Sequence, residues 1–227
     1  MSRFSGAWVS LKCIHATVES TASIEVDPDR PRIVIPEDFV SPPEGLAIRI
    51  PPEQPWPPLA IEAEQRLYTG KMAAAKAFAR ANRLDRVVLG ASDARLTIVT
   101  CGKSWQDVVA ALDMLGIDDA RARALGLKVY KVGMTFPLEP LALEEAVAGS
   151  ELVLVIEEKR PLVESQAKEL LYHHPARPRI IGKEDEEGRP LFPSYGQLDV
   201  NTVALAIARR IVARTGAADL AACVTEL

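Results

Sequence analysis

Cysteine and histidine are scarce in this chain of 227 residues, which carries three of each. The cysteines are odd in number, far apart and never in a C-x-x-C pair: Cys13, Cys101 and Cys223. A disulfide framework needs paired cysteines, and a structural metal site needs about four clustered ligands. We therefore expect no disulfide scaffold and no metal bound by this chain, and the three histidines do not supply the missing ligands.

Long hydrophobic runs and an excess of one charge are also missing. The longest strongly apolar run, Leu152–Ile156, has five residues, whereas a membrane-spanning helix needs about 20. Near the N-terminus Arg3, Lys12 and His15 interrupt the apolar residues, so no secretory signal is predicted. The 27 basic and 31 acidic residues give a net charge of −4, which argues against nucleic-acid binding. These absences predict a cytoplasmic globular protein that contacts neither membrane nor nucleic acid.

Proline divides the chain into two parts. Ten of the 17 prolines lie between Pro28 and Pro58, a stretch that cannot be helical. Short β-rich runs at 23–26, 32–35 and 46–50 are separated there by turn residues, which predicts a proline-rich extended arm. Residues 61–84 contain no proline and many helix-forming residues, so we expect one or two helices with Gly70 as the weak point.

From Arg86 onward, short β-branched runs alternate with amphipathic segments, which is typical of βαβ units. The predicted strands cover residues 86–89, 96–100, 127–132, 152–156 and 179–181. The predicted helices cover residues 104–115, 141–148, 162–173 and 201–215. The run LVLVI is apolar at every position, as in a strand covered on both faces. The sequence predicts an α/β fold with a mostly parallel, doubly wound sheet, and a charged surface excursion at 182–193.

The sharpest local signal is TCGKSWQD at 100–107, between a predicted strand and a predicted helix. A Walker A loop is excluded, because the position five residues before Gly102 is a threonine inside the strand. Two interpretations remain open. The helix N-terminus, with Lys103, could hold one anion. Alternatively, Ser104 and Asp107 form a capping box and Lys103 is solvated, which is the commoner arrangement.

Two further segments follow predicted strands at the carboxyl edge of the sheet, where α/β folds place ligands. GMTFPLEP at 133–140 is explained more simply as a rigid crossover whose Pro140 starts a helix. EEKRP at 157–161 could supply paired carboxylates for acid–base chemistry. We favour a structural charge cluster in which Lys159 and Arg160 keep both carboxylates ionised and Pro161 begins a helix. His173 and His174 are predicted to end that helix. No catalytic residue is predicted.

Seven blocks along the chain resemble one family, in order and over nearly the whole length. They are SGAWVSLKCIHATVES from Ser5, SIEVDPDRPRIVIPEDF from Ser23, KMAAAKAFARANRLDR from Lys71, LTIVTCGKSWQDVVAALDMLGID from Leu96, KVYKVGMTFPLEP from Lys128, VIEEKRPLVESQAKELLY from Val155 and RPRIIGKEDEEGRPLFPSYGQLD from Arg177. This set is similar to an internal segment of indolepyruvate:ferredoxin oxidoreductases, within the thiamine-dependent 2-oxoacid:ferredoxin oxidoreductases. The crossover and EE pattern also resembles the C-terminal domain of transketolases.

The resemblance implies a parent enzyme that decarboxylates an arylpyruvate with thiamine diphosphate and Mg²⁺, passes electrons through [4Fe-4S] clusters to ferredoxin, and forms an acyl-coenzyme A. Residues 1–60 would be the tail of a pyrimidine-binding module and a proline-rich connector, and residues 61–227 a transketolase C-terminal-like domain. The family's GDG-type motif and cysteine-rich motifs are missing from this chain, and its thiamine-activating glutamate should precede Met1. We therefore expect a fragment or truncated homologue that binds no cofactor and does not turn over alone.

The expected role is a noncatalytic assembly domain that packs against the remaining domains or subunits and forms a homodimer. Thr100, Gly102, Lys103 and Ser104 are the predicted contacts for an anion or for coenzyme A. Two alternatives stay open: a stand-alone module that binds an anion or nucleotide, and a pure dimerisation domain.

Overall fold

The computed structural model describes all residues except 44, 47–57, 176 and 227. The chain forms two compact units, Met1–Arg83 and Leu84–Leu227. The division between these units falls after the helical segment that follows the prolines. The domain boundary at residue 60 stays a prediction.

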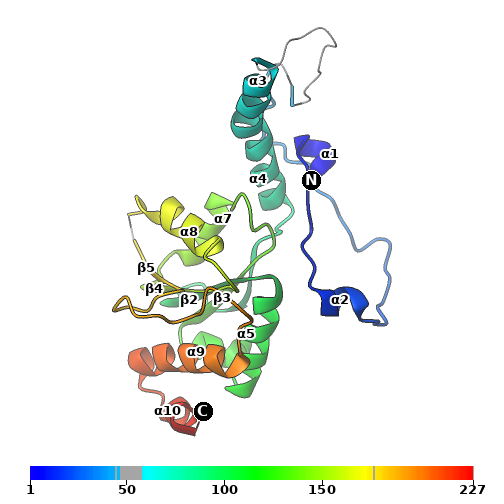
Figure 1. Cartoon of the computed structure of the whole chain (residues 1–227). Coiled ribbons are helices and arrows are strands. Elements are labelled where there is room, and N and C mark those ends of the chain that lie inside the picture. The colour runs from blue at the N-terminus through cyan, green and yellow to red at the C-terminus, as the bar shows by residue number, and fades with distance from the viewer. Residues whose placement is uncertain (44, 47–57, 176, 227) are drawn as a thin grey trace. The chain divides into compact units, whose positions relative to one another are not determined.

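The helical segment predicted for residues 61–84 is one continuous stretch in the first unit, but it begins at Pro58 and ends at Ala81 (Figure 1). It consists of α3 (Pro58–Arg66), a π-helical turn η1 (Leu67–Lys71) and α4 (Met72–Ala81). Gly70 lies in the π-helical turn, where an added Cβ would come within 2.9 Å of the Leu46 side chain. The predicted weak point is therefore a place where the helix changes its winding without ending.

Contacts between α4 and the residues before it explain why the helix belongs to the first unit. The ring of Phe4, in α1 (Ser2–Ser5), has its centroid 5.9 Å from that of Phe78 of α4, and it meets the Phe39 ring edge to face at a centroid distance of 5.7 Å. The Asn82 side chain accepts a hydrogen bond from the Val34 amide and donates one to the Val34 carbonyl, each at 2.8 Å. Among its described residues, the arm otherwise contains one short helix, α2 (His15–Glu19).

The predicted β-rich runs of the arm do not become strands in the part of the arm that the structure describes. Residues 23–26 and 32–35 form neither helix nor strand. Of the predicted run 46–50, all but Leu46 lies outside the described residues.

The second unit is built on a five-stranded sheet in the order β1-β3-β2-β4-β5. The strands are β1 (Arg86–Gly90), β2 (Leu96–Cys101), β3 (Leu127–Val132), β4 (Leu152–Ile156) and β5 (Arg179–Ile181). The pairs β2–β3, β2–β4 and β4–β5 are parallel, and only the edge strand β1 is antiparallel to its neighbour β3. The predicted strands and the mostly parallel α/β sheet are confirmed.

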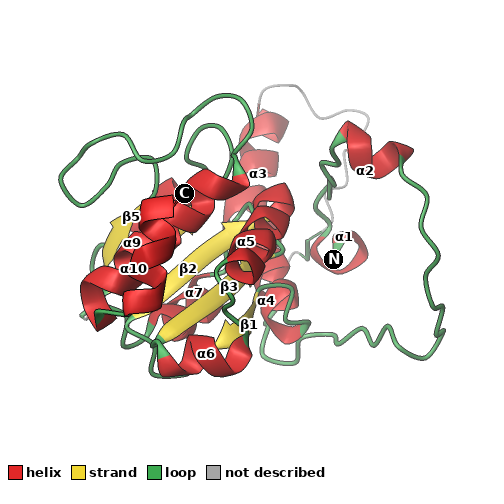
Figure 2. Ribbon diagram, turned by 90° about the horizontal axis from the view of Figure 1, so that it is seen from below, coloured by secondary structure: helices red, strands yellow, loops and turns green. Residues whose placement is uncertain are grey.

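Helices cover both faces of this sheet (Figures 1 and 2). They are α5 (Gly102–Met114), α6 (Asp119–Ala124), α7 (Pro140–Val147), α8 (Val163–Leu171), α9 (Val200–Thr215) and α10 (Ala218–Glu226). The four predicted helices are present. The sequence interpretation missed α6 and α10, which have six and nine residues and follow longer helices after a short turn.

Alternate residues of the central strands enter two separate cores. In β4, Leu152, Leu154 and Ile156 pack with α5 and α9, whereas Val153 and Val155 pack with α7 and α8. This division follows from the two-residue repeat of a strand, which points successive side chains to opposite faces. The uniformly apolar sequence of β4 is thus the signature of burial on both sides.

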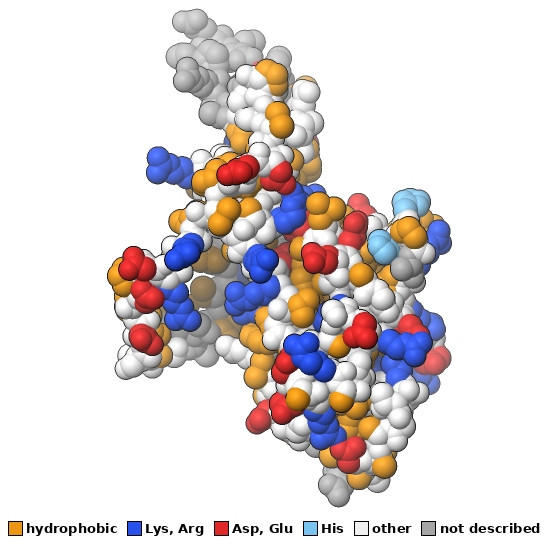
Figure 3. Space-filling model, turned by 180° about the vertical axis from the view of Figure 1, so that it is seen from behind, with side chains coloured by type: hydrophobic (Ala, Val, Ile, Leu, Met, Phe, Trp, Pro, Cys, Tyr) orange, Lys and Arg blue, Asp and Glu red, His pale blue; other side chains and the backbone are white. Residues whose placement is uncertain are grey.

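The remaining surface carries no field of a single charge on the face that Figure 3 shows, where acidic and basic side chains are interspersed. Among the described residues, no helix is long and apolar enough to cross a membrane.

Gly90 is required at the end of β1, and replacing it should destabilise the second unit. Its φ is +103°, and an added Cβ would lie 2.0 Å from the Leu127 carbonyl oxygen. Gly90→Ala should lower the free energy of unfolding by about 2–4 kcal/mol, since strain and overpacking add. Urea unfolding followed by circular dichroism measures this loss.

Gly149→Ala is the matched control, because Gly149 also has a positive φ, +79°, but no atom within 4 Å of an added Cβ. We expect this variant to lose only about 1 kcal/mol. Equal losses in the two variants would show that the contact with Leu127 is unimportant.

Candidate functional site

The sheet has one topological switch point, between the carboxyl ends of β2 and β4. The chain leaves β2 for β3 on one side, and then returns from β3 to β4 on the other side of β2. Open α/β sheets bind ligands in the crevice at such a point. The predicted anion loop, 100–104, and the EEKRP segment lie here because they follow these two strands.

Lys103 is held at this point by two carboxylates. Its Nζ lies 3.0 Å from Asp107 Oδ2 and 3.1 Å from Glu158 Oε1, and it donates to the Leu198 carbonyl at 3.3 Å. Burial works against the charged ammonium, but the pairing with the Asp107 and Glu158 carboxylates outweighs it and raises the pKa of Lys103. The lysine is therefore charged, but its charge is already offset, and it is not simply solvated as one interpretation expected.

The predicted capping box is wrong. Helix α5 begins at Gly102 with Cys101 as its N-cap, so Ser104 and Asp107 lie inside the helix, and no side chain caps it. Gly102 can take the first position of the helix because glycine tolerates a φ of +54°, which other residues rarely adopt. Asp107 is buried and turned toward Lys103, one helical turn away.

The four predicted anion contacts therefore lie together but differ in what they offer. Thr100 has a buried hydroxyl with no hydrogen-bond partner in the described part of the chain. Gly102 begins the helix that exposes free amides, and Ser104 is buried in its first turn. Lys103 could bind a ligand only by exchanging Glu158 or Asp107 for it. An anion or coenzyme A contact here stays a prediction.

Glu157 caps the helix that follows β4. Its carboxylate accepts hydrogen bonds from the amides of Leu162, Val163 and Glu164 at 2.9–3.1 Å. A buried carboxylate at a helix N-terminus is stabilised by these amides and by the helix dipole. Glu157 thus has a structural part and does not pair with Glu158 for acid–base work.

The cations that contact Glu157 and Glu158 are not Lys159 and Arg160, their neighbours in the sequence, as we had predicted. Glu158 pairs with Lys103, and the Lys183 Nζ donates to the Glu157 carbonyl at 2.6 Å and to the Pro193 carbonyl at 3.2 Å. Lys159 is exposed, with a φ of +60°. Sequence reasoning missed Lys183, because only the fold brings the segment after β5 back over β4.

Residues 182–198 therefore form a strap over the switch point. The Glu164 carboxylate accepts from the Lys183 amide at 2.9 Å, and Glu158 accepts from the Leu198 amide at 3.2 Å. Phe192 and Leu198 of the strap enter the core beside α5 and α9. The predicted surface excursion, 182–193, is exposed only in part, because Gly182 and Phe192 are buried and Lys183 contacts the residues that follow β4.

A second polar cluster lies where β3 ends. Asp85 Oδ1 accepts hydrogen bonds from the Gly133 and Met134 amides at 2.7 and 2.9 Å. Asp85 Oδ2 and the Tyr130 hydroxyl are buried and have no hydrogen-bond partner among the described residues. Burial raises the pKa of Asp85 and that of Tyr130. The cluster fixes the loop and has no exposed reactive group.

The crossover at 133–140 is the rigid connection that the prolines predict. Pro140 occupies the first turn of α7, and Glu139 caps that helix by accepting from the Ala142 amide at 2.6 Å. His173 and His174 lie just beyond the end of α8, where the Tyr172 ring meets the His173 ring.

The described residues do not fit a metal or cluster site. They contain no group of three or more His, Cys, Asp or Glu side chains arranged around a common centre. All three cysteines are free thiols, and burial, with the nearby Glu157 charge, raises the pKa of Cys101 to about 11. A protonated, half-buried thiol is a poor ligand and nucleophile at neutral pH. We therefore derive no reaction step through a cluster or through thiamine diphosphate on this chain.

Residues 86–227 match the family described as the indolepyruvate oxidoreductase domain. The chain belongs to this family. Similar proteins include the indolepyruvate oxidoreductase subunit IorA of Methanothermobacter thermautotrophicus, 33% identical over 126 residues, which are 55% of this chain and 19% of that protein. The IorA subunit of Pyrococcus horikoshii is 36% identical over 95 residues, 42% of this chain and 14% of that protein. The chain thus spans about a fifth or less of the curated relatives it matches.

Two solved structures are also similar in part. A 2-oxoglutarate:ferredoxin oxidoreductase from Magnetococcus marinus aligns over 70% of this chain and 24% of its own, with 12% identity and a TM-score of 0.45. A split-gene transketolase, described as an inactive β4 tetramer, aligns over 56% of this chain and 41% of its own, with 22% identity and a TM-score of 0.39. Both scores are below 0.5, which is too low to establish a shared fold.

Asp85 should make the stability of the domain depend on pH. Its pKa is raised on folding, so its favourable contribution is complete below the unfolded value and is lost as pH rises through the folded value. Asp85→Asn keeps the oxygen that accepts from Gly133 and Met134 but removes the charge. The free energy of unfolding of Asp85→Asn should therefore increase relative to that of the native chain as pH rises from about 4 to 7.

Asp85→Ala is the comparison, because it leaves the two amides without an acceptor and should cost about 1–3 kcal/mol at every pH. Urea unfolding at several pH values measures all three proteins. Parallel pH profiles for the native chain and Asp85→Asn would contradict the assignment of a buried, titrating carboxyl group.

Proposed function

We propose that this chain is a noncatalytic structural and assembly domain of a thiamine-dependent indolepyruvate:ferredoxin oxidoreductase, which oxidatively decarboxylates arylpyruvates to acyl-coenzyme A. The match of residues 86–227 to the indolepyruvate oxidoreductase domain carries the proposal. In it, other domains or subunits hold thiamine diphosphate, Mg²⁺ and the [4Fe-4S] clusters. Ferredoxin and coenzyme A bind to the complete enzyme, which is cytoplasmic. In our interpretation the domain is transketolase C-terminal-like, and it contributes to a homodimer.

The use of the buried charged side chains supports a structural role. Glu157 caps α8, Glu139 caps α7, and Lys128 donates to the carbonyls of Ser92 and Ala146 at 3.0 and 2.9 Å. Catalytic acids and bases need a perturbed group that faces a reactant. Here the strap contacts the switch point of the sheet through Leu198, and Lys103 and Glu158 neutralise each other there.

A reconstitution assay tests this function. The chain is mixed with the remaining polypeptides of the oxidoreductase from its source, and indolepyruvate-dependent reduction of ferredoxin is followed with thiamine diphosphate, Mg²⁺ and coenzyme A present. We expect no turnover from the chain alone, turnover from the mixture, and a mixture mass by light scattering that corresponds to two copies of each component. Turnover by the chain alone, or full turnover without it, contradicts the proposal.

The predicted coenzyme A contact at Lys103 can be tested in the same mixture. Removing the cation with Lys103→Ala should raise KM for coenzyme A by about tenfold, which is what one charge-assisted contact contributes. Glu158→Gln should have the opposite effect, since it frees Lys103 from a competing carboxylate. Arg123→Ala is the control, because its ion pair with Asp119 is exposed, lies on α6 and involves no residue of the strap. An unchanged KM in the first two variants shows that Lys103 is structural only.

A further inference from the structure

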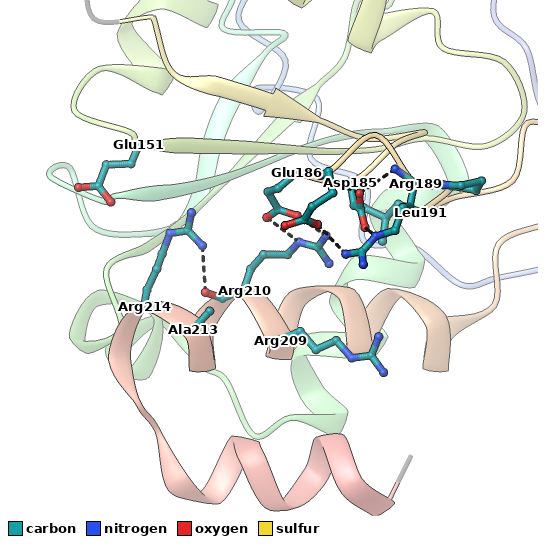
Figure 4. A pocket seen from close by; sticks show the side chains of 11 residues that line it. Glu151, Asp185, Glu186, Arg189, Leu191, Arg209, Arg210, Ala213 and Arg214 are labelled. Atoms are coloured by element: carbon teal, nitrogen blue, oxygen red, sulfur yellow. Dashed lines mark hydrogen bonds and ion pairs between the residues drawn. The ribbon is translucent and has the colours of Figure 1, made fainter.

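The larger surface pocket is balanced in charge. It has a volume of about 780 Å³ and lies between α9 and the first half of the strap (Figure 4). Four carboxylates and four arginines line it. Arg210 pairs with Glu186 at 2.8 Å. Arg189 pairs with Asp185 at 2.8 Å and with Glu187 at 2.6 Å. The charges of this pocket are satisfied by one another, and nothing in it favours a ligand of either charge.

A second pocket, of about 410 Å³, has charges that are not balanced in this way. It lies beside α5, between that helix, the end of β1 and the turn before α6. Its apolar lining consists of Leu89, Trp105, Val109, Leu112 and Ile117. The three lining residues from α5 recur at intervals of three or four positions, so they lie on one face of the helix. We call this pocket the α5 groove.

The exposed face of α5 next to the groove carries little charge. From Trp105 to the end of the helix, the exposed positions are 106, 109, 110, 113 and 114, and only Asp113 among them is ionic. The side chains of Val109 and Met114 are 44% and 48% exposed. A helix face that meets water is normally polar or charged. This composition is instead typical of a surface that packs against another protein.

Two cations lie at the Trp105 end of the groove. The Lys131 Nζ lies 5.3 Å from the centroid of the Trp105 ring. Arg86, the first residue of β1, is directly opposite Lys131 in the sheet, so both side chains lie on the face that α5 covers. Neither cation has a carboxylate partner among the described residues. Like charges opposite each other destabilise a sheet, so this end of the groove favours an anionic group from outside.

Two carboxylates lie at the other end, which is about 12 Å away because Trp105 and Asp113 are eight positions apart on α5. Asp113 and Asp118 line the groove there. Asp118 accepts a hydrogen bond from the Arg121 amide at 2.8 Å, whereas the Asp113 carboxylate has no partner in the described part of the chain. Both arginines of α6 are paired with other carboxylates. The α5 groove thus has a positive end and a negative end.

We propose that the α5 groove is the contact between two copies of this chain, whose α5 helices pack antiparallel around a twofold axis. In that arrangement the Asp113 end of each copy faces the Lys131 end of the other, so opposite charges meet twice. Val109, midway between Trp105 and Asp113, lies at the axis. A twofold contact has to be self-complementary in this way. A parallel arrangement of the two helices brings like charges together.

This inference rests on the proposed function, in which the domain contributes to a homodimer, and it names the surface that forms the dimer. The exposed Val109 and Met114 side chains of each copy pack against the groove of the other. Trp105 provides the large aromatic contact surface that interface centres favour. The charges at the two ends then set the orientation of the helices.

Sedimentation velocity on the purified chain, over a range of concentrations, tests this contact. We expect the native chain to dimerise. Val109→Glu places two carboxylates against each other at the axis and should raise the dissociation constant of the dimer about tenfold or more. Leu141→Glu is the matched control, because Leu141 is 52% exposed on α7, which covers the opposite face of the sheet. The control should dimerise like the native chain. Circular dichroism spectra and melting temperatures like those of the native chain confirm that both variants fold.

Reversing the charges tests the orientation. Asp113→Lys alone and Lys131→Glu alone should each weaken dimerisation, because each brings like charges together across the contact. The variant with both changes should recover most of the native affinity, since the exchanged charges again face each other. A purely local effect of either substitution on the fold would not be reversed by the other.

A native chain that stays monomeric overturns the inference. Equal dimerisation of Val109→Glu and Leu141→Glu also overturns it, and a double charge variant without recovery overturns the antiparallel orientation. A failure of the proposed function is seen in a different measurement, as the absence of turnover in the reconstituted mixture, and it leaves the mass of the purified chain unchanged.

Discussion

The second unit depends on one constraint, which is that β2 and β4 must be covered on both faces. Nearly all side chains of these two adjacent parallel strands are buried, and they alternate between two cores. Burial of apolar area is the dominant favourable contribution to folding, so helices must lie on both sides. Polar chemistry is therefore confined to the strand ends, and the carboxyl ends of β2 and β4 become the place where charges gather.

The charged side chains at these strand ends interact with other groups of the protein. Lys103, Glu157, Glu158 and Lys183 each have a partner in the fold, either a carboxylate, a backbone amide or a carbonyl. A buried charge without a partner costs several kcal/mol, so such a network is strongly determined by the chain that closes over it. The strap provides much of that closure. A sheet edge that binds ligands in many α/β proteins is occupied here by the protein's own residues.

Much of the fold could be predicted from the sequence, because its strongest signals are local. Apolar runs such as LVLVI set the strands, and Pro140 set the start of α7. The site was less predictable, since its contacts join residues far apart in the chain. Asp85 accepts a hydrogen bond from the Gly133 amide, and Lys103 pairs with Glu158 and donates to the Leu198 carbonyl. The capping box failed for a different reason: Gly102 can start a helix in a conformation that other residues avoid, so the helix begins two residues before the expected cap.

The boundary at Arg83 also has an evolutionary meaning. The compact unit begins at Leu84, and the match to the indolepyruvate oxidoreductase domain begins at residue 86. The segment that folds around its own cores is thus almost the same segment that relatives share as a recognisable module. Both of its cores are made only of residues after this boundary, so the module contains the apolar surface that it needs to fold as a unit.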